Sequence, residues 1–227
     1  APLTPIYHQL ITSQKKIKLP VCILNIGGIS NITIIKRHIG FLDLFSRDIG
    51  PGNCLIDSWV RKNSNKKFDM DGKLAASGIR NEIIFEQAQE LYNNRLDKIK
   101  LSYDVNDFDI SFSRGLSLED GATTLTDFTA SIISENLSSI LKEEKIINEI
   151  LICGGGRKNK ILLKEIEKNL PKKINLKLID DYNLNGDFIE SQAFAFIAIR
   201  TFINLPSSFP TTTNCNEPIV DGELIEN

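Results

Sequence analysis

The first candidate site is a pair of glycines inside "LNIGGISNIT", residues 24–33, where Gly27 and Gly28 separate two β-branched runs. Glycine accepts positive φ and lets a ligand approach the backbone closely, so the amides of this turn could converge on a phosphate. The side chain of Ser30 or Asn31 could add a further donor. Gly-Gly is also a favoured dipeptide in plain hairpin turns, so this motif alone leaves a phosphate loop and a simple turn as alternatives.

A second glycine cluster, Gly154 to Gly156 in "LICGGGRKNK", follows an apolar run and precedes a helical pattern. Glycines at such a junction leave room for a flat ligand, and the helix N-terminus offers free amides. The cluster has neither the G-x-G-x-x-G spacing of a dinucleotide site nor the G-K-S/T of a P-loop. A ligand site and a tight strand-to-helix turn therefore both remain open.

Two carboxylates lie where they could face a ligand. Asp48 in "RDIGPGN" precedes a glycine-proline turn, where it could bind a magnesium shell or a sugar hydroxyl, or cap its own turn. Glu190 in "NGDFIES" falls in the first turn of an apolar helix, where it could bind a polar ligand or complement the helix dipole. His8 and His38 have no acid or nucleophile at useful spacing, which argues against a hydrolase triad.

The elements that must position these residues follow from periodicity. "VCILNIGGISNITIIK" and "IGFLDLF" predict an antiparallel strand set over residues 21–45. A loop at Gly50–Gly52 then leads to Asn53, which is well placed to cap a helix running through Val60.

Amphipathic helices are predicted over residues 79–96 and 122–143, with Ser117 and Asp120 forming an approximate capping box before the second. Between them, residues 98–115 are mixed and polar, which indicates an extended excursion or insertion. "INEILICGGGRKNKILLKEIEKNL" followed by "INLKLID" predicts a βαβ unit and hence an α/β sheet. "DFIESQAFAFIAIRTFINL" is apolar almost all round, which predicts a buried helix, and the proline-bearing tail is expected to pack as an ordered strap.

Composition excludes several classes of function. The 227 residues carry a net charge of -2 without a basic patch, so nucleic acid is not an expected partner. No apolar run approaches the ~18 residues of a membrane span and the start lacks a signal-peptide layout, so we expect a cytoplasmic protein with no membrane partner. The four cysteines lack a C-x-x-C pair, which predicts reduced thiols, with Cys22 and Cys153 in the core.

Two glycine turns on one sheet suit a nucleotide held at both ends, with phosphates on the hairpin and adenosine on the triple glycine. Together with other ordered stretches they carry a family resemblance. The sequence resembles the anhydro-N-acetylmuramic acid kinases of the actin, sugar kinase and Hsp70 superfamily. The stretches that carry it are "APLTPIYHQL", "LNIGGISNIT", "DIGPGNCLIDSWV", "FDMDGKLAASG", "SLEDGATTLTDFTA", "LICGGGRKNK", "GDFIESQAFAFIAIR" and "LPSSFPTTT".

The resemblance implies one α/β, actin-like ATPase (ribonuclease H-like) lobe over residues 1–227, with a mixed sheet and helices on both faces. It implies that residues 25–31 form the second phosphate loop and Gly154 to Gly156 the adenosine motif, with Asp48 and Glu190 in catalysis. The implied cofactor-binding residues are Asn25, Gly27, Gly28, Ser30, Asn31, Gly154, Gly155 and Gly156. The implied substrate contacts are Asp48, Gly50 and Asn53 in the interdomain cleft and Glu190 against the sugar.

The implied reaction uses ATP, Mg²⁺ and water to open the 1,6-anhydro ring and phosphorylate the 6-hydroxyl, a step of cell-wall recycling. The resemblance assigns no metal ligand. The expected partners are the amino sugar, ATP, a second copy in a homodimer and a separate N-terminal lobe.

The sequence departs from the family pattern at its start. Family members carry an N-terminal lobe with a D-S-G-T-S phosphate loop, and their aspartate base precedes a G-Q-G-A-P segment, whereas this sequence begins at Ala-Pro. "KIKLSYDVNDF" follows the family's P-P-K-S stretch only loosely. We therefore expect a kinase lobe that is inactive alone and exposes an apolar docking surface, with a nucleotide-binding remnant or a scaffold module as alternatives.

Overall fold

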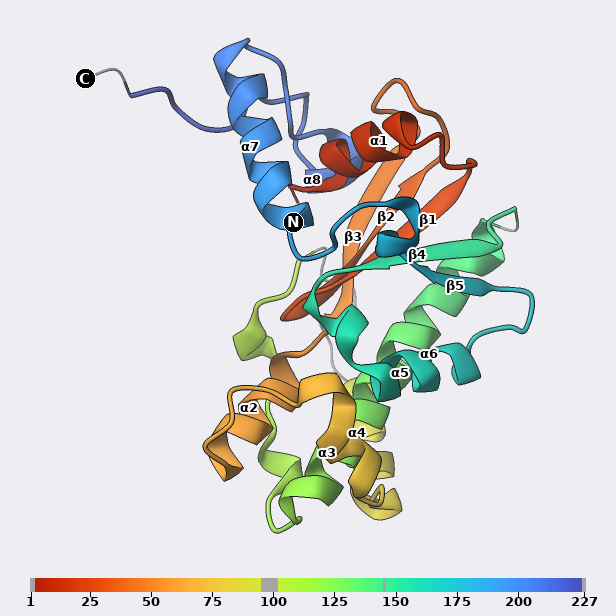
Figure 1. Ribbon diagram of the computed structural model, residues 1–227, viewed down its shortest axis with the longest axis vertical. Helices are drawn as coiled ribbons and strands as arrows, with labels where there is room; N and C mark the ends of the chain where they lie inside the picture. The colour runs from red at the N-terminus through yellow and green to blue at the C-terminus, as the bar shows by residue number, and fades with distance from the viewer. Residues whose placement is uncertain (1–2, 95–101, 145, 226–227) are drawn as a thin grey trace.

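The computed structural model describes residues 3–94, 102–144 and 146–225, and a single five-stranded sheet organises them (Figure 1). The sheet has the strand order β3-β2-β1-β4-β5. Its strands are β1 (Val21–Ile26), β2 (Ile29–Ile35), β3 (Leu44–Pro51), β4 (Glu149–Cys153) and β5 (Asn175–Leu178). The helices are α1 (Pro5–Gln14), α2 (Cys54–Asn63), α3 (Lys73–Ser77), α4 (Glu82–Asn93), α5 (Leu118–Glu143), α6 (Lys160–Asn169), α7 (Ile189–Phe202) and α8 (Pro210–Thr213).

The pairing of β1 fixes where the two glycine turns lie. β1 runs antiparallel to β2, so Gly27 and Gly28 form a two-residue hairpin turn after Ile26. On its other side β1 runs parallel to β4, with Asn25 opposite Cys153. Because the carboxyl ends of parallel neighbours meet at one edge, the hairpin and the Gly154 turn lie side by side.

Helices cover both faces of this sheet, as the sequence predicts. Cys22, Leu24 and Ile26 of β1 pack on the face covered by α5 and α6. The alternate residues Val21 and Ile23 pack on the opposite face, with α1 and α7. Strands buried on both faces read as continuous apolar runs, which explains the imperfect alternation in this segment. The mixed sheet with helices on both faces is the arrangement predicted from the sequence.

A third core lies apart from the sheet, in the chain between β3 and β4 (Figure 1). Here α2, α3 and α4 pack against the N-terminal part of α5. Trp59 is the central side chain of this core, and its Nε1 donates a 2.9 Å hydrogen bond to the Leu118 carbonyl. Its ring lies so close to Gly121 that a Cβ there would sit 2.2 Å from a ring carbon. The segment between β3 and β4 therefore forms a small helical layer beside the sheet.

Several predicted boundaries shift. The third strand covers Leu44–Pro51 and so continues past residue 45, and Gly50, which was predicted to lie in a loop, stands inside β3 together with Asp48. The predicted helix over 79–96 is α4, and α5 begins at Leu118, where Ser117 accepts a hydrogen bond from the Asp120 amide as predicted. Of the predicted excursion, residues 98–101 lie outside the described residues. Its later part forms two 3₁₀ turns, Val105–Asp107 and Ser111–Ser113.

The prediction that α7 is buried all round is wrong. Only Ile189, Ala193 and Ile197 are buried, whereas Phe194 and Phe202 are 54% and 73% exposed. The helix lies on the outside of α1, so a neighbour covers one stripe and the rest of its apolar surface faces solvent (Figure 1).

The tail is ordered, as predicted. Ser208 pairs with Ile219 in an antiparallel bridge, and the buried Phe209 ring stacks on Phe41 at 5.1 Å between centroids. All four cysteines are free, and Cys22 and Cys153 are fully buried in the core. No helix in the described ranges is long and apolar enough to cross a membrane.

Candidate functional site

A cavity of about 200 Å³ lies at the sheet edge where the two glycine turns meet. Among its walls are five residues that the sequence singled out as site residues. These are Asn25, Gly27, Gly154, Gly155 and Glu190. Parts of the chain more than 150 residues apart therefore converge here, which neither glycine motif could show alone. We call this space the edge cavity.

Close packing explains why the second turn is built of glycines. Gly154 has φ of +81°, and a Cβ there would lie 2.5 Å from the Ile26 carbonyl oxygen. A Cβ at Gly156 would lie 2.2 Å from Ile26 Cγ2. Gly155 is exposed, and the nearest atom to a Cβ there is Asn53 Nδ2 at 3.9 Å. The outer two glycines thus allow the turn to sit on β1, and the middle one faces open space.

The hairpin turn is held from its other side by the start of α2. The Gly27 carbonyl accepts a 2.8 Å hydrogen bond from the Asn53 amide, and the Gly28 carbonyl accepts one of 2.9 Å from Gly52. Asn53 is the N-cap residue of α2, but its side chain does not cap the helix. Its Nδ2 lies 3.5 Å from the Ile26 carbonyl oxygen instead. The hairpin, the triple glycine and α2 therefore form one rigid junction.

A second cavity of about 470 Å³ opens on the other side of Gly155, and we call it the helical cavity. The N-cap residue Asn53 and Asp57 of α2 line it, together with the half-exposed apolar side chains of Phe68 and Met70. Burial raises the pKa of Asp57 to about 6, with Asp69 adding to the rise and Arg61 opposing it. Since Gly155 lines both cavities, an elongated ligand could cross from one to the other over this residue.

Arg157 holds the third wall of the edge cavity in place. Its buried guanidinium donates to both carboxylate oxygens of Asp180 at 2.8 and 3.2 Å, to Asp187 at 2.9 Å and to the Gly154 carbonyl at 3.1 Å. Gly186 lies against this guanidinium, because a Cβ there would be 2.3 Å from Arg157 Nε. A buried cation stays charged when it is paired in this way. The loop that leads to Glu190 is thereby fixed to the triple-glycine turn.

Other predicted site residues lie outside the edge cavity. Ser30 is fully buried and its hydroxyl donates to the Pro51 carbonyl at 3.0 Å, which gives it an internal partner. Gly50 packs against Ile132, where a Cβ would lie 2.6 Å from a methyl carbon. The residues that the sequence named and that do not line the edge cavity are Gly28, Ser30, Asn31, Asp48, Gly50, Asn53 and Gly156.

Asp48 and Asn31 face each other across the β2–β3 ladder. Asp48 is 9% exposed, and its Oδ2 accepts a 2.8 Å hydrogen bond from the Tyr103 amide. Burial raises the pKa of Asp48, and that amide and the Ser102 hydroxyl oppose the rise. Asn31 Oδ1 is buried without a partner among the described residues. The two carboxylates named from the sequence, Asp48 and Glu190, therefore do not share one cavity.

His8 is a wall residue of the edge cavity that the sequence reasoning set aside. It is 1% exposed, and its Nδ1 lies 2.8 Å from Thr33 Oγ1. Burial lowers the pKa of His8 to about 4, so the ring is neutral near pH 7. In the sequence, His8 stands out only as a polar residue within the apolar run "PIYHQLI". This pattern indicates that His8 is buried, but it does not indicate a role in a site.

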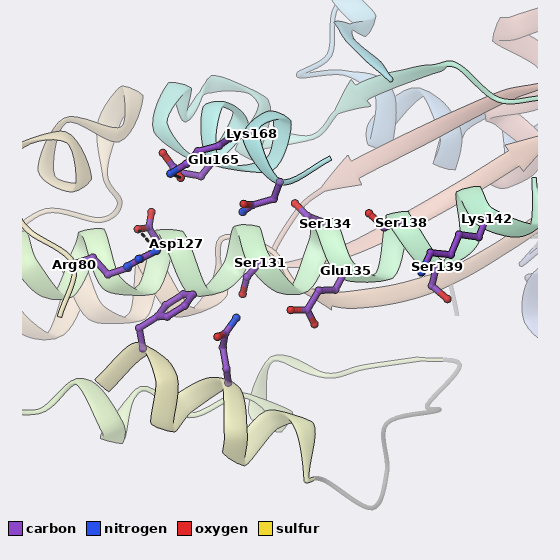
Figure 2. A pocket seen from close by; sticks show the side chains of 13 residues that line it. Arg80, Asp127, Ser131, Ser134, Glu135, Ser138, Ser139, Lys142, Glu165 and Lys168 are labelled. Carbon is purple, nitrogen blue, oxygen red and sulfur yellow. Dashed lines mark hydrogen bonds and ion pairs between the residues drawn. The ribbon is translucent and has the colours of Figure 1, made fainter. Parts of the chain in front are cut away.

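A further cavity of about 510 Å³ runs along the polar face of α5 between α4 and α6 (Figure 2). Two ion pairs lie in its walls, with Arg80 3.5 Å from Asp127 and Lys168 2.9 Å from Glu165. Burial raises the pKa of Asp127 to about 6, and the nearby Glu165 adds to this. Neither glycine turn lines this groove, so it is separate from the candidate site.

The sequence model of the family "Anhydro-N-acetylmuramic acid kinase" matches residues 1–226. A protein of that name from Pelagibacter ubique is 51% identical over all of this chain, which covers 60% of that relative. Relatives of the same name from Zymomonas mobilis and Caulobacter vibrioides are 36% and 35% identical over 99% of the chain, which covers 59% and 58% of them. The chain therefore spans about 60% of the length of these relatives.

One solved structure that matches is the activator of the 2-hydroxyisocaproyl-CoA dehydratase from Clostridium difficile with bound ADPNP. The match covers 83% of this chain and 64% of the activator chain, at 12% sequence identity and a TM-score of 0.47. This likeness is too distant to carry an argument about the chain.

The packing of the triple glycine generates a first prediction. Gly156→Ala forces a methyl group into Ile26 and should lower the free energy of unfolding by roughly 1–3 kcal/mol, the usual cost of overpacking. Gly155→Ala, its matched control, meets no atom closer than 3.9 Å and should stay within about 0.5 kcal/mol of the parent. Urea denaturation of the three proteins measures the difference. Equal stabilities would show that the turn does not press on β1.

The buried histidine generates a second prediction. The pKa of His8 is lower in the folded chain than its ordinary value, so between pH 6.5 and about 4 the unfolded state binds more protons and stability falls as pH falls. From pH 7 to pH 5 the parent should lose about 2 kcal/mol relative to His8→Gln. The raised pKa values of Asp57 and Asp127 act in the opposite direction but are common to both proteins. Parallel pH profiles of the unfolding free energy would contradict a buried neutral His8.

Proposed function

We propose, because the chain belongs to the anhydro-N-acetylmuramic acid kinase family, that it supplies nucleotide and sugar contacts to an ATP-dependent sugar kinase. The reaction consumes ATP, water and 1,6-anhydro-N-acetylmuramic acid and yields ADP and N-acetylmuramic acid 6-phosphate. One observation carries the proposal: both glycine turns stand at one sheet edge, beside two cavities that share Gly155. This arrangement suits a nucleotide and a sugar bound next to each other.

The nucleotide would lie across Gly155. Its adenine would enter the helical cavity, where Phe68 and Met70 offer apolar surface and the Asp57 carboxylate offers an acceptor for an amine or a ribose hydroxyl. Its phosphates would then run toward Gly27, where the two-residue turn leaves the backbone open to close approach. A Cβ at Gly27 would lie 3.4 Å from the Ile29 carbonyl oxygen, an ordinary contact distance, so close packing within the protein does not account for this glycine.

Magnesium fits this arrangement as a companion of the phosphates. Among the residues that the structure describes, no three histidine, cysteine or acidic side chains gather into a metal site. Mg²⁺ commonly keeps several waters and binds through substrate phosphates with one or two carboxylates, so a preformed cage is not required. When bound, the ion would neutralise charge on the phosphoryl oxygens.

Glu190 is the carboxylate that best fits the sugar. It lines the edge cavity from the first turn of α7 and makes no hydrogen bond or ion pair within the described part of the chain. Asp187 lines the same cavity, but Arg157 at 2.9 Å and Lys158 at 2.7 Å hold its carboxylate and lower its pKa to about 2. Glu190 is therefore free to accept hydrogen bonds from sugar hydroxyls. Roles for Asp48, Gly50 and Asn53 at the cleft stay predictions.

A nucleotide-binding module without turnover is the alternative, and the same junction would serve it. The two differ in the sugar, because only the kinase needs a sugar site beside the nucleotide. A homodimer and a role in cell-wall recycling stay predictions from the family resemblance, and a cytoplasmic location stays a prediction from the composition.

Substitution at Gly155 tests the nucleotide site. Gly155→Val places a branched side chain where the two cavities meet and should weaken Mg-ADP binding at least about tenfold, while Gly155→Ala should have a smaller effect. Isothermal titration of the chain with Mg-ADP measures both affinities. Ser139→Val, on the exposed face of α5, introduces the same side chain elsewhere and should bind ADP as the parent does. Equal affinity of the parent and Gly155→Val would contradict a nucleotide path over this residue.

A further inference from the structure

Two polar atoms in the wall of the edge cavity lack partners. Thr4 Oγ1 and His8 Nε2 are both buried, and neither makes a hydrogen bond within the described ranges of the chain. Both residues line this cavity. Leaving a buried donor or acceptor unpaired costs about 1–3 kcal/mol, so such atoms call for an explanation. Two of them beside one cavity indicate that a bound molecule supplies the missing partners.

The two residues are held in fixed positions on one face of α1. They are four positions apart at the start of the helix, and residues with this spacing are neighbours on a helix surface. The His8 amide donates to the Thr4 carbonyl at 2.9 Å, which closes the first helical turn. The imidazole is fixed as well, since its Nδ1 is engaged by the fully buried Thr33 hydroxyl at 2.8 Å. Nε2 is then the one ring nitrogen left for a ligand.

We propose that Thr4 and His8 form a subsite that hydrogen-bonds the neutral polar substituents of the sugar, opposite the carboxylate of Glu190. This inference rests on the proposed function and adds two specificity-determining residues to it. A hydroxyl group and a neutral imidazole can each donate or accept, so they match the hydroxyl and amide groups of an amino sugar. Glu190, which can only accept when ionised, would take hydroxyl protons from the other side.

The charges around the cavity argue against an anionic occupant of this subsite. Two carboxylates, Asp187 and Glu190, line the same space. Arg157 and Lys158, which contact one of these carboxylates, are paired with Asp187 at 2.9 and 2.7 Å. Burial lowers the pKa of His8 to about 4, so the ring adds no positive charge near neutral pH. A phosphate, or the sugar's own carboxylate, would meet acceptors and few donors in this subsite, whereas the hydroxyl and amide groups of the sugar would pair with Thr4, His8 and Glu190.

The volume of the edge cavity also favours a sugar as its occupant. The edge cavity measures about 200 Å³, below the roughly 300–1,000 Å³ of pockets that hold drug-sized ligands. It suits a single sugar ring better than a nucleotide, which has the larger helical cavity of about 470 Å³ next to it. The adenine and ribose would thus occupy the helical cavity and the sugar the edge cavity, with the phosphates passing over Gly155 where the two cavities meet.

Thr4→Val tests the subsite because it removes the hydroxyl and keeps the shape of the side chain. The free protein should be as stable as the parent or more so, since an unpaired buried hydroxyl is lost. The affinity for 1,6-anhydro-N-acetylmuramic acid, titrated into the chain saturated with Mg-ADP, should fall about tenfold, with ADP affinity unchanged. A purely structural role would reverse this pattern and lower stability alone.

Thr12→Val is the matched control on the same helix. Thr12 is fully buried too, but its hydroxyl donates to the Gln9 carbonyl at 2.8 Å, so this variant should lose stability and bind the sugar as the parent does. Sugar affinity equal in the parent and Thr4→Val would overturn the subsite while leaving the proposed function intact. A parent that binds Mg-ADP but no sugar at millimolar concentration would overturn the sugar part of the proposed function, and the subsite with it.

Discussion

The seating of the triple-glycine turn on the end of β1 is the contact on which the rest of the site depends. Parallel pairing of β1 with β4 brings both turns to one edge, but only the absence of side chains at Gly154 and Gly156 lets the second turn touch Ile26. That contact sets the distance between hairpin and turn and leaves Gly155 exposed between two cavities. The glycines that let the turn pack on β1 thus also leave an exposed position, Gly155, that a ligand can approach.

Arg157 connects the triple-glycine turn to the wall of the edge cavity that contains Asp187. Its guanidinium joins the Gly154 carbonyl to Asp180 and Asp187, and so ties the loop before α7 to the turn. Burying a charge is unfavourable unless the charge is fully paired. Removing one partner would therefore leave an uncompensated buried charge and destabilise the protein. Glu190 follows this loop directly, so its position relative to the glycine turns is set by electrostatics as much as by the hydrophobic core.

Local patterns in the sequence predicted much of this arrangement. The hairpin at Gly27, the βα turn at Gly154 and the capping by Ser117 are each encoded within a few residues, and all three are present. What could not be predicted depends on distant parts of the chain. The apolar composition of α7 did not reveal that only α1 and its neighbours would cover it, and β3 extends past Phe45 because its pairing with β2 continues to Pro51.

The residues that line the edge cavity also depend on contacts between distant parts of the chain. Nothing near His8 in the sequence indicates that Thr33 fixes its ring or that Glu190 lies across the same cavity, because those contacts join α1, β2 and α7. We infer from the shared position of Gly155 that one nucleotide crosses this residue between the two cavities. A crystal structure of the chain with Mg-ADP tests it most directly. We expect adenine beside Phe68 and Met70, with the diphosphate over Gly155 toward Gly27. ADP bound instead in the groove along α5, or a diphosphate remote from both glycine turns, would contradict it.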